Sequence, residues 1–484
     1  MNFRLIERVL GWLVLVYAAI MGIPFFCALL WKESSGMPFL FTIALTGVVG
    51  FVLTGHGRRE GRMGIREGFA IVAGAWILTS LAGALPFYLS HAVPSYIDGL
   101  FEAVSGLTTT GASVIDNVEF LPKSLLLWRS LTHWLGGMGI IVLFIVFLPK
   151  FGARAVHLFN AEVPGPMAER VLPRIRDNAS KLWQIYVGFT LLQIVLLVVA
   201  GMSWFDAINH SFATMATGGF STKNSSIMDY NNIGIELIIV VFMIIAGGNF
   251  GLYFLAWSRG LKHIWQDTEF RIYLAIIAGS TLVIALTLWL AGGNEIVSSL
   301  RLSLFQVTSI MTTTGFATAN FDKWPSLAKM VLFLLMFLGG SAGSTAGGIK
   351  VARLILLMKL GWAELRRAVH PRAVVSINYG GKHVDPLMLN TVAVFFFLFM
   401  SIFAVATILL SSTGLEPFDA MSAVAATLGN VGPGFGVVGP STTYSSINAF
   451  GEVILILCML LGRLELFTLL VVLQPEFWRS RKSW

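Results

Sequence analysis

Four short segments contain the residues whose types and spacing could do chemistry. In each segment a polar residue lies two positions before a glycine, and a small residue lies two positions after it. The sets that end at the glycine are Thr109, Thr110 and Gly111; Thr217, Gly218 and Gly219; Thr313, Thr314 and Gly315; and Asn430, Val431 and Gly432. The glycines are 108, 96 and 117 residues apart, which indicates that one module is used four times.

These segments offer oxygen ligands for a cation. A cation that leaves water must replace its hydration shell, and a ring of backbone carbonyls can do so without burying fixed charge. Glycine permits the conformations that turn successive carbonyls to one side, and a neighbouring threonine hydroxyl can join the ring. The pattern predicts one cation-binding ring built from all four segments. In the alternative interpretation, the glycines only form turns or helix-packing contacts.

Each glycine segment follows an amphipathic stretch that is too short to cross a bilayer. The stretches cover 97–109, 205–217, 299–313 and 418–429. Irregular backbone at membrane depth is tolerated only where protein or a water-filled cavity surrounds it, so we expect four re-entrant helices. Their partially negative C-termini would point toward the ion path.

Two further positions align before the glycines. Thirteen residues before them lie Asp98, Asp206, Leu302 and Asp419. We expect the three aspartates to cap the short helices, with direct ion binding as the alternative. Nine residues before them lie Glu102, His210, Gln306 and Ala423, a mixture that predicts helix packing or support of the ring rather than acid–base catalysis.

The composition indicates a membrane protein. Of 484 residues, 56% are hydrophobic and only 12% are charged, about half the share typical of soluble domains. Ten apolar runs are long enough to span a bilayer: 9–31, 37–55, 70–90, 125–149, 182–202, 233–258, 271–291, 328–358, 387–411 and 449–473. Cys27 and Cys458 lie inside these runs and are expected to pack there, without a disulfide framework.

Basic residues are concentrated in alternate loops. They cluster near residues 58–66, 150–181, 259–271 and 350–382, and at both ends of the chain. The positive-inside rule makes these segments cytoplasmic, and both termini with them. Topology therefore explains the net charge of +8, and we expect no nucleic-acid partner.

The fold class that follows is an all-α membrane protein. We expect four pseudo-symmetric modules around one pore, each a membrane span, a pore loop and a second span, with an additional N-terminal two-helix hairpin. The expected boundaries are 1–67 for the hairpin and 68–160, 161–262, 263–365 and 366–484 for pore modules 1 to 4.

The four glycine segments and the stretch 339–350 (Gly-Gly-Ser-Ala-Gly-Ser-Thr-Ala-Gly-Gly-Ile-Lys) carry a family resemblance. The sequence resembles the TrkH/TrkG/TrkI type of bacterial potassium-uptake subunit, within the Trk/Ktr/HKT superfamily, over essentially its whole length. The resemblance implies potassium uptake across the bacterial inner membrane, with Gly111, Gly219, Gly315 and Gly432 as filter glycines. The fourth segment departs most from Thr-x-Gly, which makes the symmetry of the ring imperfect.

The resemblance also implies partners. These are potassium, membrane lipid, a second copy of the chain in a homodimer, and a soluble nucleotide-binding subunit of the TrkA kind. Any nucleotide would bind that subunit, and the chain itself would need no cofactor. The cytoplasmic loops 150–181 and 359–383 are large enough to dock it.

The stretch 339–350 interrupts an apolar run with five glycines, so the helix must break there. Its glycines do not match a phosphate-binding loop, because Ile349 separates Gly348 from Lys350. The resemblance implies an intramembrane gating loop, and the expected gating residues are Gly343, Gly347, Gly348, Lys350 and Arg463. The alternatives are a helix-packing kink, a pairing of Arg463 with Glu465 or Glu452, and a Lys350 side chain that extends to the cytoplasmic interface.

The sequence shows no nucleophile–base set, metal-ligand spacing or cofactor motif, so we do not expect an enzyme. The favoured function is channel-like cation uptake through a carbonyl filter. The alternative is a transporter with alternating access or with sodium or proton coupling. Because all four modules begin on the cytoplasmic side, whereas alternating-access folds usually contain inverted repeats, the pore is preferred.

Overall fold

The computed structural model describes residues 1–57, 64–139, 175–292 and 295–479, with backbone only for 175–179. The second half of the expected span 125–149, most of the basic loop 150–181 and the basic cluster at 58–63 lie outside the described residues. The described residues are mostly helical, with one antiparallel pair of short strands, β1 (Asn378–Tyr379) and β2 (Lys382–His383).

The helices of the first half are α1 (Phe3–Ile20), α2 (Gly22–Leu30), α3 (Gly36–His56), α4 (Ile65–Leu89), α5 (Tyr96–Leu107), α6 (Lys123–Gly137), α9 (Ile175–Val199), α10 (Trp204–Met215), α11 (Ile233–Ala246) and α12 (Phe250–Arg259). Those of the second half are α13 (Lys262–Gln266), α14 (Thr268–Leu290), α15 (Ile296–Met311), α16 (Ser326–Leu335), α17 (Val351–Val369), α18 (Pro386–Ser411), α19 (Pro417–Leu428), α20 (Ala449–Arg463), α21 (Phe467–Leu473) and α22 (Pro475–Trp478). Short 3-10 turns lie at Val118–Phe120, Ser226–Tyr230, Phe321–Lys323, Gly436–Val438 and Tyr444–Ser446.

Six helical segments in the described residues are long and apolar enough to cross a membrane. They are Phe3–Leu30, α3, α4, Ser180–Val199, α14 and α18. Two bent pairs can be added: α11 with α12, at 91°, and α20 with α21, at 117°. The other two of the ten expected runs differ, because 125–149 extends beyond the described residues and 328–358 is divided into α16 and α17. The chain is a multi-pass membrane protein.

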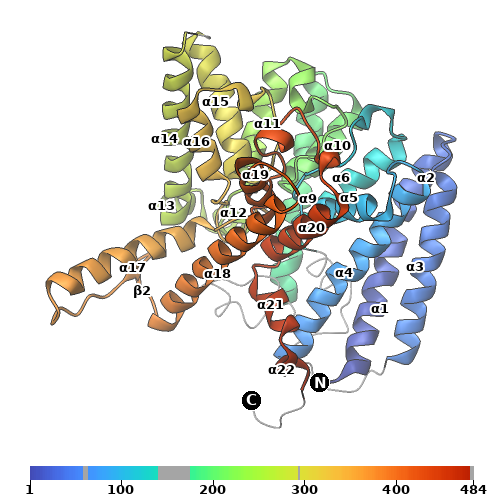
Figure 1. Cartoon of the computed structure of the whole chain (residues 1–484), viewed down its shortest axis with the longest axis horizontal. Helices are drawn as coiled ribbons and strands as arrows, with labels where there is room; N and C mark the ends of the chain where they lie inside the picture. The colour runs from blue at the N-terminus through green and yellow to red at the C-terminus, as the bar shows by residue number, and fades with distance from the viewer. Residues whose placement is uncertain (58–63, 140–174, 293–294, 480–484) are drawn as a thin grey trace.

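The two ends of the chain meet at one end of the molecule. The rings of Phe3 in α1 and Trp478 in α22 are stacked with their centroids 6.2 Å apart, and Figure 1 shows α22 close to the start of α1. The helices nearest the two ends of the chain therefore pack against each other. The N-terminal hairpin is also present, with α1 packed along α3.

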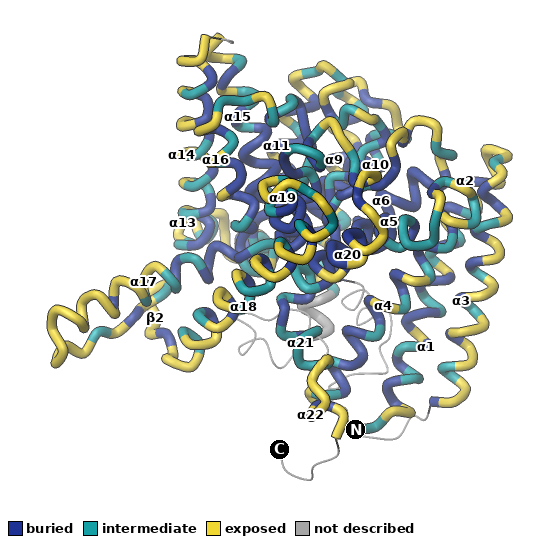
Figure 2. Tube along the Cα trace, in the orientation of Figure 1, coloured by how far each residue is buried: buried dark blue, intermediate teal, exposed yellow. Residues whose placement is uncertain are grey.

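Burial distinguishes the outer helices from the inner ones (Figure 2). The outward face of α3 exposes large apolar side chains such as Met37, Phe41 and Phe51, as expected of a surface that faces lipid. The short helices α5 and α19 are mostly buried at the centre. The polar groups of these two helices are therefore enclosed by protein, as membrane depth requires.

The four short helices α5, α10, α15 and α19 agree with the predicted re-entrant segments to within a few residues. Asp98 caps α5 as expected, since its carboxylate accepts from the backbone N–H of Ser95 at 2.8 Å. The capping prediction is wrong for the other two aspartates. Asp206 accepts from the hydroxyls of Ser203 and Thr222, and Asp419 accepts the backbone N–H of Val437 in the loop beyond its helix.

Candidate ion-binding site

The four glycine segments adopt the same turn at the ends of α5, α10, α15 and α19. In each turn the residue before the glycine donates its backbone N–H to a carbonyl five residues earlier: Thr110 to Ser105 (2.9 Å), Gly218 to Ala213 (2.8 Å), Thr314 to Ser309 (2.8 Å) and Val431 to Ala426 (2.7 Å). This bond closes the last turn of a helix and directs the chain away from its axis. Sequence positions that were aligned by residue type therefore have the same local structure.

The turns share an unusual backbone conformation. A left-handed residue begins each of them: Thr109 (φ 55°), Thr217 (55°), Thr313 (54°) and Asn430 (54°). The glycine two positions later also has a positive φ, between 80° and 96°. Left-handed backbone is a genuine outlier for a β-branched residue such as threonine, and such strain is found mostly at functional sites.

The next segment lies directly against each of these glycines, so no side chain would fit at these positions. A β-carbon on Gly111 would collide with the carbonyl oxygen of Gly218, one on Gly219 with that of Thr314, one on Gly315 with that of Val431, and one on Gly432 with that of Thr110. Each segment thus contacts its successor, and the fourth contacts the first. The contacts close a ring of four turns.

The threonine hydroxyls next to the glycines are engaged within the ring. Thr110 and Thr314 are hydrogen-bonded to the hydroxyls of Thr108 and Thr312, each at 2.7 Å. Asn430 also donates to the Thr110 hydroxyl at 2.9 Å. None of the four turns contains a carboxylate, so the oxygen atoms that they can offer to an ion are backbone carbonyls, threonine hydroxyls and the Asn430 amide.

A cavity of about 120 Å³ adjoins the ring on the side of the residues that follow the glycines. Gly111, Gly219 and Gly315 line it, together with Pro433 of the fourth segment. Polar and charged residues line its wall, namely Asp116, Arg129, Lys223, Asn224 and Thr443. The cavity makes one face of the ring accessible to small polar species.

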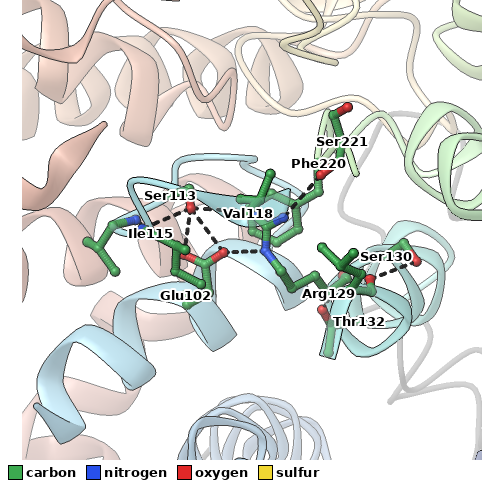
Figure 3. Close-up of polar contacts among 12 residues, drawn as sticks. Glu102, Ser113, Ile115, Val118, Arg129, Ser130, Thr132, Phe220 and Ser221 are labelled. Carbon is green, nitrogen blue, oxygen red and sulfur yellow. Dashed lines mark hydrogen bonds and ion pairs between the residues drawn. The ribbon is translucent and has the colours of Figure 1, made fainter. Parts of the chain in front are cut away.

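A buried ion pair supports the first two segments (Figure 3). Arg129 of α6 and Glu102 of α5 are paired at 2.6 Å, with side chains 3% and 0% exposed. Ser113 donates to the Glu102 carboxylate at 3.1 Å, and Arg129 donates to the Ser221 carbonyl at 3.2 Å. The pair therefore holds the chain beyond Gly111 and beyond Gly219 together. Arg129 could not be predicted from the repeats, because no basic residue recurs at its position relative to the glycines.

The residues nine positions before the glycines have the predicted supporting role in three repeats. Besides Glu102, His210 is hydrogen-bonded to the Ser221 hydroxyl at 3.0 Å, and Gln306 accepts the N–H of Thr318 at 3.2 Å. In the fourth repeat Ala423 cannot take this role. Its neighbour Ser422 does so instead and accepts the N–H of Phe435 at 2.6 Å.

The glycine-rich stretch lies on the opposite side of the ring. The helix breaks as predicted, since α16 ends at Leu335 and α17 begins at Val351. The stretch fits into the bend between α11 and α12, where Ser341 donates to Gly247 O at 2.8 Å and Phe250 donates to Gly343 O at 3.2 Å. Two interrupted helices therefore satisfy each other's free backbone groups.

The same stretch touches three of the four turns. The N–H of Gly347 donates to the Thr313 hydroxyl at 2.7 Å, and the hydroxyls of Thr217 and Thr345 are 3.4 Å apart. A β-carbon on Gly347 would lie 2.8 Å from Cβ of Asn430. The loop is thus packed directly under the ring, and Gly347 leaves no space for a side chain.

Arg463, at the end of α20, holds the loop in place. Its guanidinium donates to Thr345 O at 2.7 Å, and to Gly136 O at 2.6 Å and Gly137 O at 2.9 Å at the end of α6. The alternative partners are engaged elsewhere. Glu465 pairs with Arg353, and Glu452 lies in the first turn of α20, at the opposite end of that helix from Arg463.

Two further charged residues, Lys350 and Glu269, form hydrogen bonds with the backbone of the loop. Lys350 is buried and donates to Ala346 O, so its side chain does not extend to the interface as the alternative interpretation required. Glu269 at the start of α14, which sequence reasoning missed, accepts the N–H groups of Ala342 at 2.7 Å and Ala352 at 3.1 Å. Its carboxylate thus joins the loop to α17.

Comparisons with known proteins agree with this architecture. The family model TrkH, described as a cation transport protein, matches residues 37–480. The TrkH potassium uptake protein of the Escherichia coli K12 Trk system is 42% identical, over 99% of this chain and all of the relative. TrkI of Halomonas elongata is 33% identical, over 98% of this chain and 97% of the relative.

A solved structure gives the same result. The crystal structure of the potassium transporter TrkH from Vibrio parahaemolyticus matches with a TM-score of 0.90 and 40% identity, over 99% of this chain and all of that chain. The resemblance inferred from the glycine segments is therefore confirmed, and it places the chain among transporter subunits rather than enzymes. The chain belongs to the TrkH family of cation transport proteins.

Proposed function

We propose that this protein takes up potassium through a filter formed by the four glycine turns. The proposal rests on one observation: the contacts between the segments form a closed ring, because each glycine lies against the backbone of the next segment. It gives one axis around which backbone oxygens from four segments can converge on a dehydrated ion. The ion follows from the relatives described above, which are potassium uptake proteins of Trk systems.

In this proposal the four pore modules have the boundaries expected from the sequence, 68–160, 161–262, 263–365 and 366–484. The ligands are the filter residues already named, from Thr109 to Gly111 and their counterparts. The small cavity beside the ring is the external mouth, and the glycine-rich stretch 339–350 closes the cytoplasmic side. The protein lies in the bacterial inner membrane with both termini in the cytoplasm.

The loop is the proposed gate. It fills the space under three turns, and Arg463 places a positive charge beside it through the bond to Thr345 O. A cation that moves through the ring would meet both the packed backbone and this charge. Gly343, Gly347 and Gly348 give the loop the freedom to leave, and Lys350 adds a second charge.

Regulation by a cytoplasmic partner follows from the gate. The helix α17 and the β-hairpin project from the body of the molecule (Figure 1) and expose Arg366, Arg367 and Arg372. We propose that a nucleotide-binding subunit of the TrkA kind docks on this side, and that two copies of the chain form a homodimer. Because α17 directly follows the loop, a force on α17 would reach the gate.

The test is rubidium uptake into liposomes that contain the purified protein, with potassium or sodium as competitor. A serine β-carbon at Gly315 would collide with Val431 O, so Gly315→Ser should reduce the preference for potassium. The matched control is Gly279→Ser, since a β-carbon at Gly279 in α14 meets nothing within 4 Å. Equal competition by both ions in the wild type, or an unchanged preference in Gly315→Ser, would contradict a carbonyl filter and leave a coupled transporter as the alternative.

A further inference from the structure

One loop of the fourth module crosses over the filter and reaches the first module. It contains Tyr444, whose side chain is 2% exposed and whose ring packs against Phe101 of α5 with centroids 5.4 Å apart. The backbone N–H of Tyr444 donates to Ser113 O at 2.9 Å, two residues beyond the filter glycine of the first segment. Tyr444 is also among the residues that line the cavity beside the ring. Its position is therefore fixed by contacts with two modules.

The hydroxyl of Tyr444 is bonded to the filter itself. It donates to the carbonyl oxygen of Gly432 at 2.6 Å. Within the described part of the chain, the carbonyls of Gly111, Gly219 and Gly315 accept no hydrogen bond. The fourth filter glycine is thus held by a donor that its three counterparts lack.

A comparison with the second module shows that this difference lies in the side chain. There the N–H groups of Ile227 and Met228 donate to Ala317 O, two residues beyond the glycine of the following segment, as Tyr444 does to Ser113 O. In both the second and the fourth modules, therefore, a loop donates backbone hydrogen bonds to the residue two positions beyond the glycine of the next segment. Ile227 is buried in the same way but has no polar atom to offer to the filter.

Two hydroxyls on either side of Tyr444 fasten its loop. Thr443 and Ser445 both donate to the carboxylate of Asp116 in the first module, Ser445 at 2.6 Å. These bonds lower the pKa of Asp116 from its ordinary value, which keeps the carboxylate ionised and able to accept both. The phenol is thus presented to Gly432 from a braced segment rather than from a free loop.

We propose that Tyr444 is a positioning residue that sets the ion selectivity of the fourth filter segment. This inference rests on the proposed filter. The hydrogen bond fixes the direction of the Gly432 carbonyl and occupies one of its two lone pairs, so that the oxygen presents a weaker field to an ion. A weaker field disfavours the smaller and more strongly hydrated cation, which here is sodium.

The test is Tyr444→Phe, which keeps the ring on Phe101 and removes only the hydroxyl. In the liposome assay we expect the potassium-over-sodium competition ratio to fall by about three- to tenfold, the effect of one hydrogen bond. The maximal rubidium uptake should stay within about twofold, because a free carbonyl still binds ions. Tyr96→Phe is the matched control, since its hydroxyl donates to Leu81 O at 2.8 Å, a residue of α4 rather than of the filter.

A second variant tests the same proposal if Tyr444→Phe does not fold. Thr443→Val with Ser445→Ala keeps the phenol and releases the loop from Asp116, and the competition ratio should fall in the same direction. A wild-type ratio in either folded variant overturns the role of Tyr444. If Gly315→Ser lowers the ratio in the same vesicles while the Tyr444 variants do not, only this inference fails. If none of the three lowers it, the filter itself is wrong.

Discussion

At the residue scale, two contacts beside the glycine turns could not be paired from the sequence: the Glu102–Arg129 ion pair and the hydrogen bond from Tyr444 to Gly432 O. Glu102 was visible as a polar residue at a repeated position, whereas Arg129 and Tyr444 had no counterpart at a repeated spacing. Arg129 reaches Glu102 27 positions earlier and Ser221 in the second segment, and Tyr444 reaches Gly432 and the distant Ser113, so only the folded chain brings these groups together. The glycines themselves were predictable, because a position that needs a positive φ and has no room for a β-carbon restricts the residue type strongly.

The buried Glu102–Arg129 pair leads to a stability prediction. Arg129→Gln leaves the Glu102 carboxylate buried without its charge partner, and we expect the free energy of unfolding to fall by about 3–5 kcal/mol. Arg367→Gln should cost less than about 1 kcal/mol, since Arg367 and its partner Glu364 are 45% and 58% exposed. Thermal unfolding in detergent, followed by size-exclusion chromatography, measures both. Equal losses of unfolding free energy in the two variants would mean that the buried Glu102–Arg129 pair stabilises the protein no more than the exposed pair does.

At the element scale, the sequence predicted the short helices and the break at 339–350, but not what the break contacts. Apolar periodicity and glycine content are local signals, and they located these elements to within a few residues. The bend between α11 and α12 was missed because 233–258 is apolar enough overall to be predicted as one continuous span, in spite of Gly247, Gly248 and Asn249 near its middle. The loop between α16 and α17 forms hydrogen bonds with the free backbone groups of that bend. These are tertiary contacts, which local sequence patterns do not reveal.

The gate proposal gives a prediction at this scale. Arg463→Ala removes the bonds to Thr345 O and to the end of α6, so the loop should leave its place more often. We expect rubidium uptake in the absence of any partner to rise by about three- to tenfold, as for a barrier lowered by ~1 kcal/mol. Arg259→Ala, which removes an exposed arginine at the end of α12, is the control. Uptake that stays at the wild-type level in folded Arg463→Ala would argue against a gate held by this residue.

At the scale of the whole molecule, the sequence predicts four equivalent glycine turns and their order along the chain, but it does not predict how the turns close into a ring. The repeats at Gly111, Gly219, Gly315 and Gly432 fixed the expectation of four equivalent turns. Which segment contacts which depends on how the spans pack in the membrane, and spacing along the chain carries no information about that. The contacts of Asn430 and Tyr444 show in addition that the fourth glycine segment differs from the other three in its hydrogen bonds.

The most direct measurement of the filter replaces each of the four glycines by serine in turn. Rubidium uptake with potassium or sodium as competitor is compared for Gly111→Ser, Gly219→Ser, Gly315→Ser and Gly432→Ser, with Gly279→Ser as the control. We expect every filter variant to lower the potassium-over-sodium ratio by about threefold or more, because each β-carbon meets the backbone of the next segment. A ratio that stays at the wild-type value in folded variants of two or more segments would contradict a single ring of four.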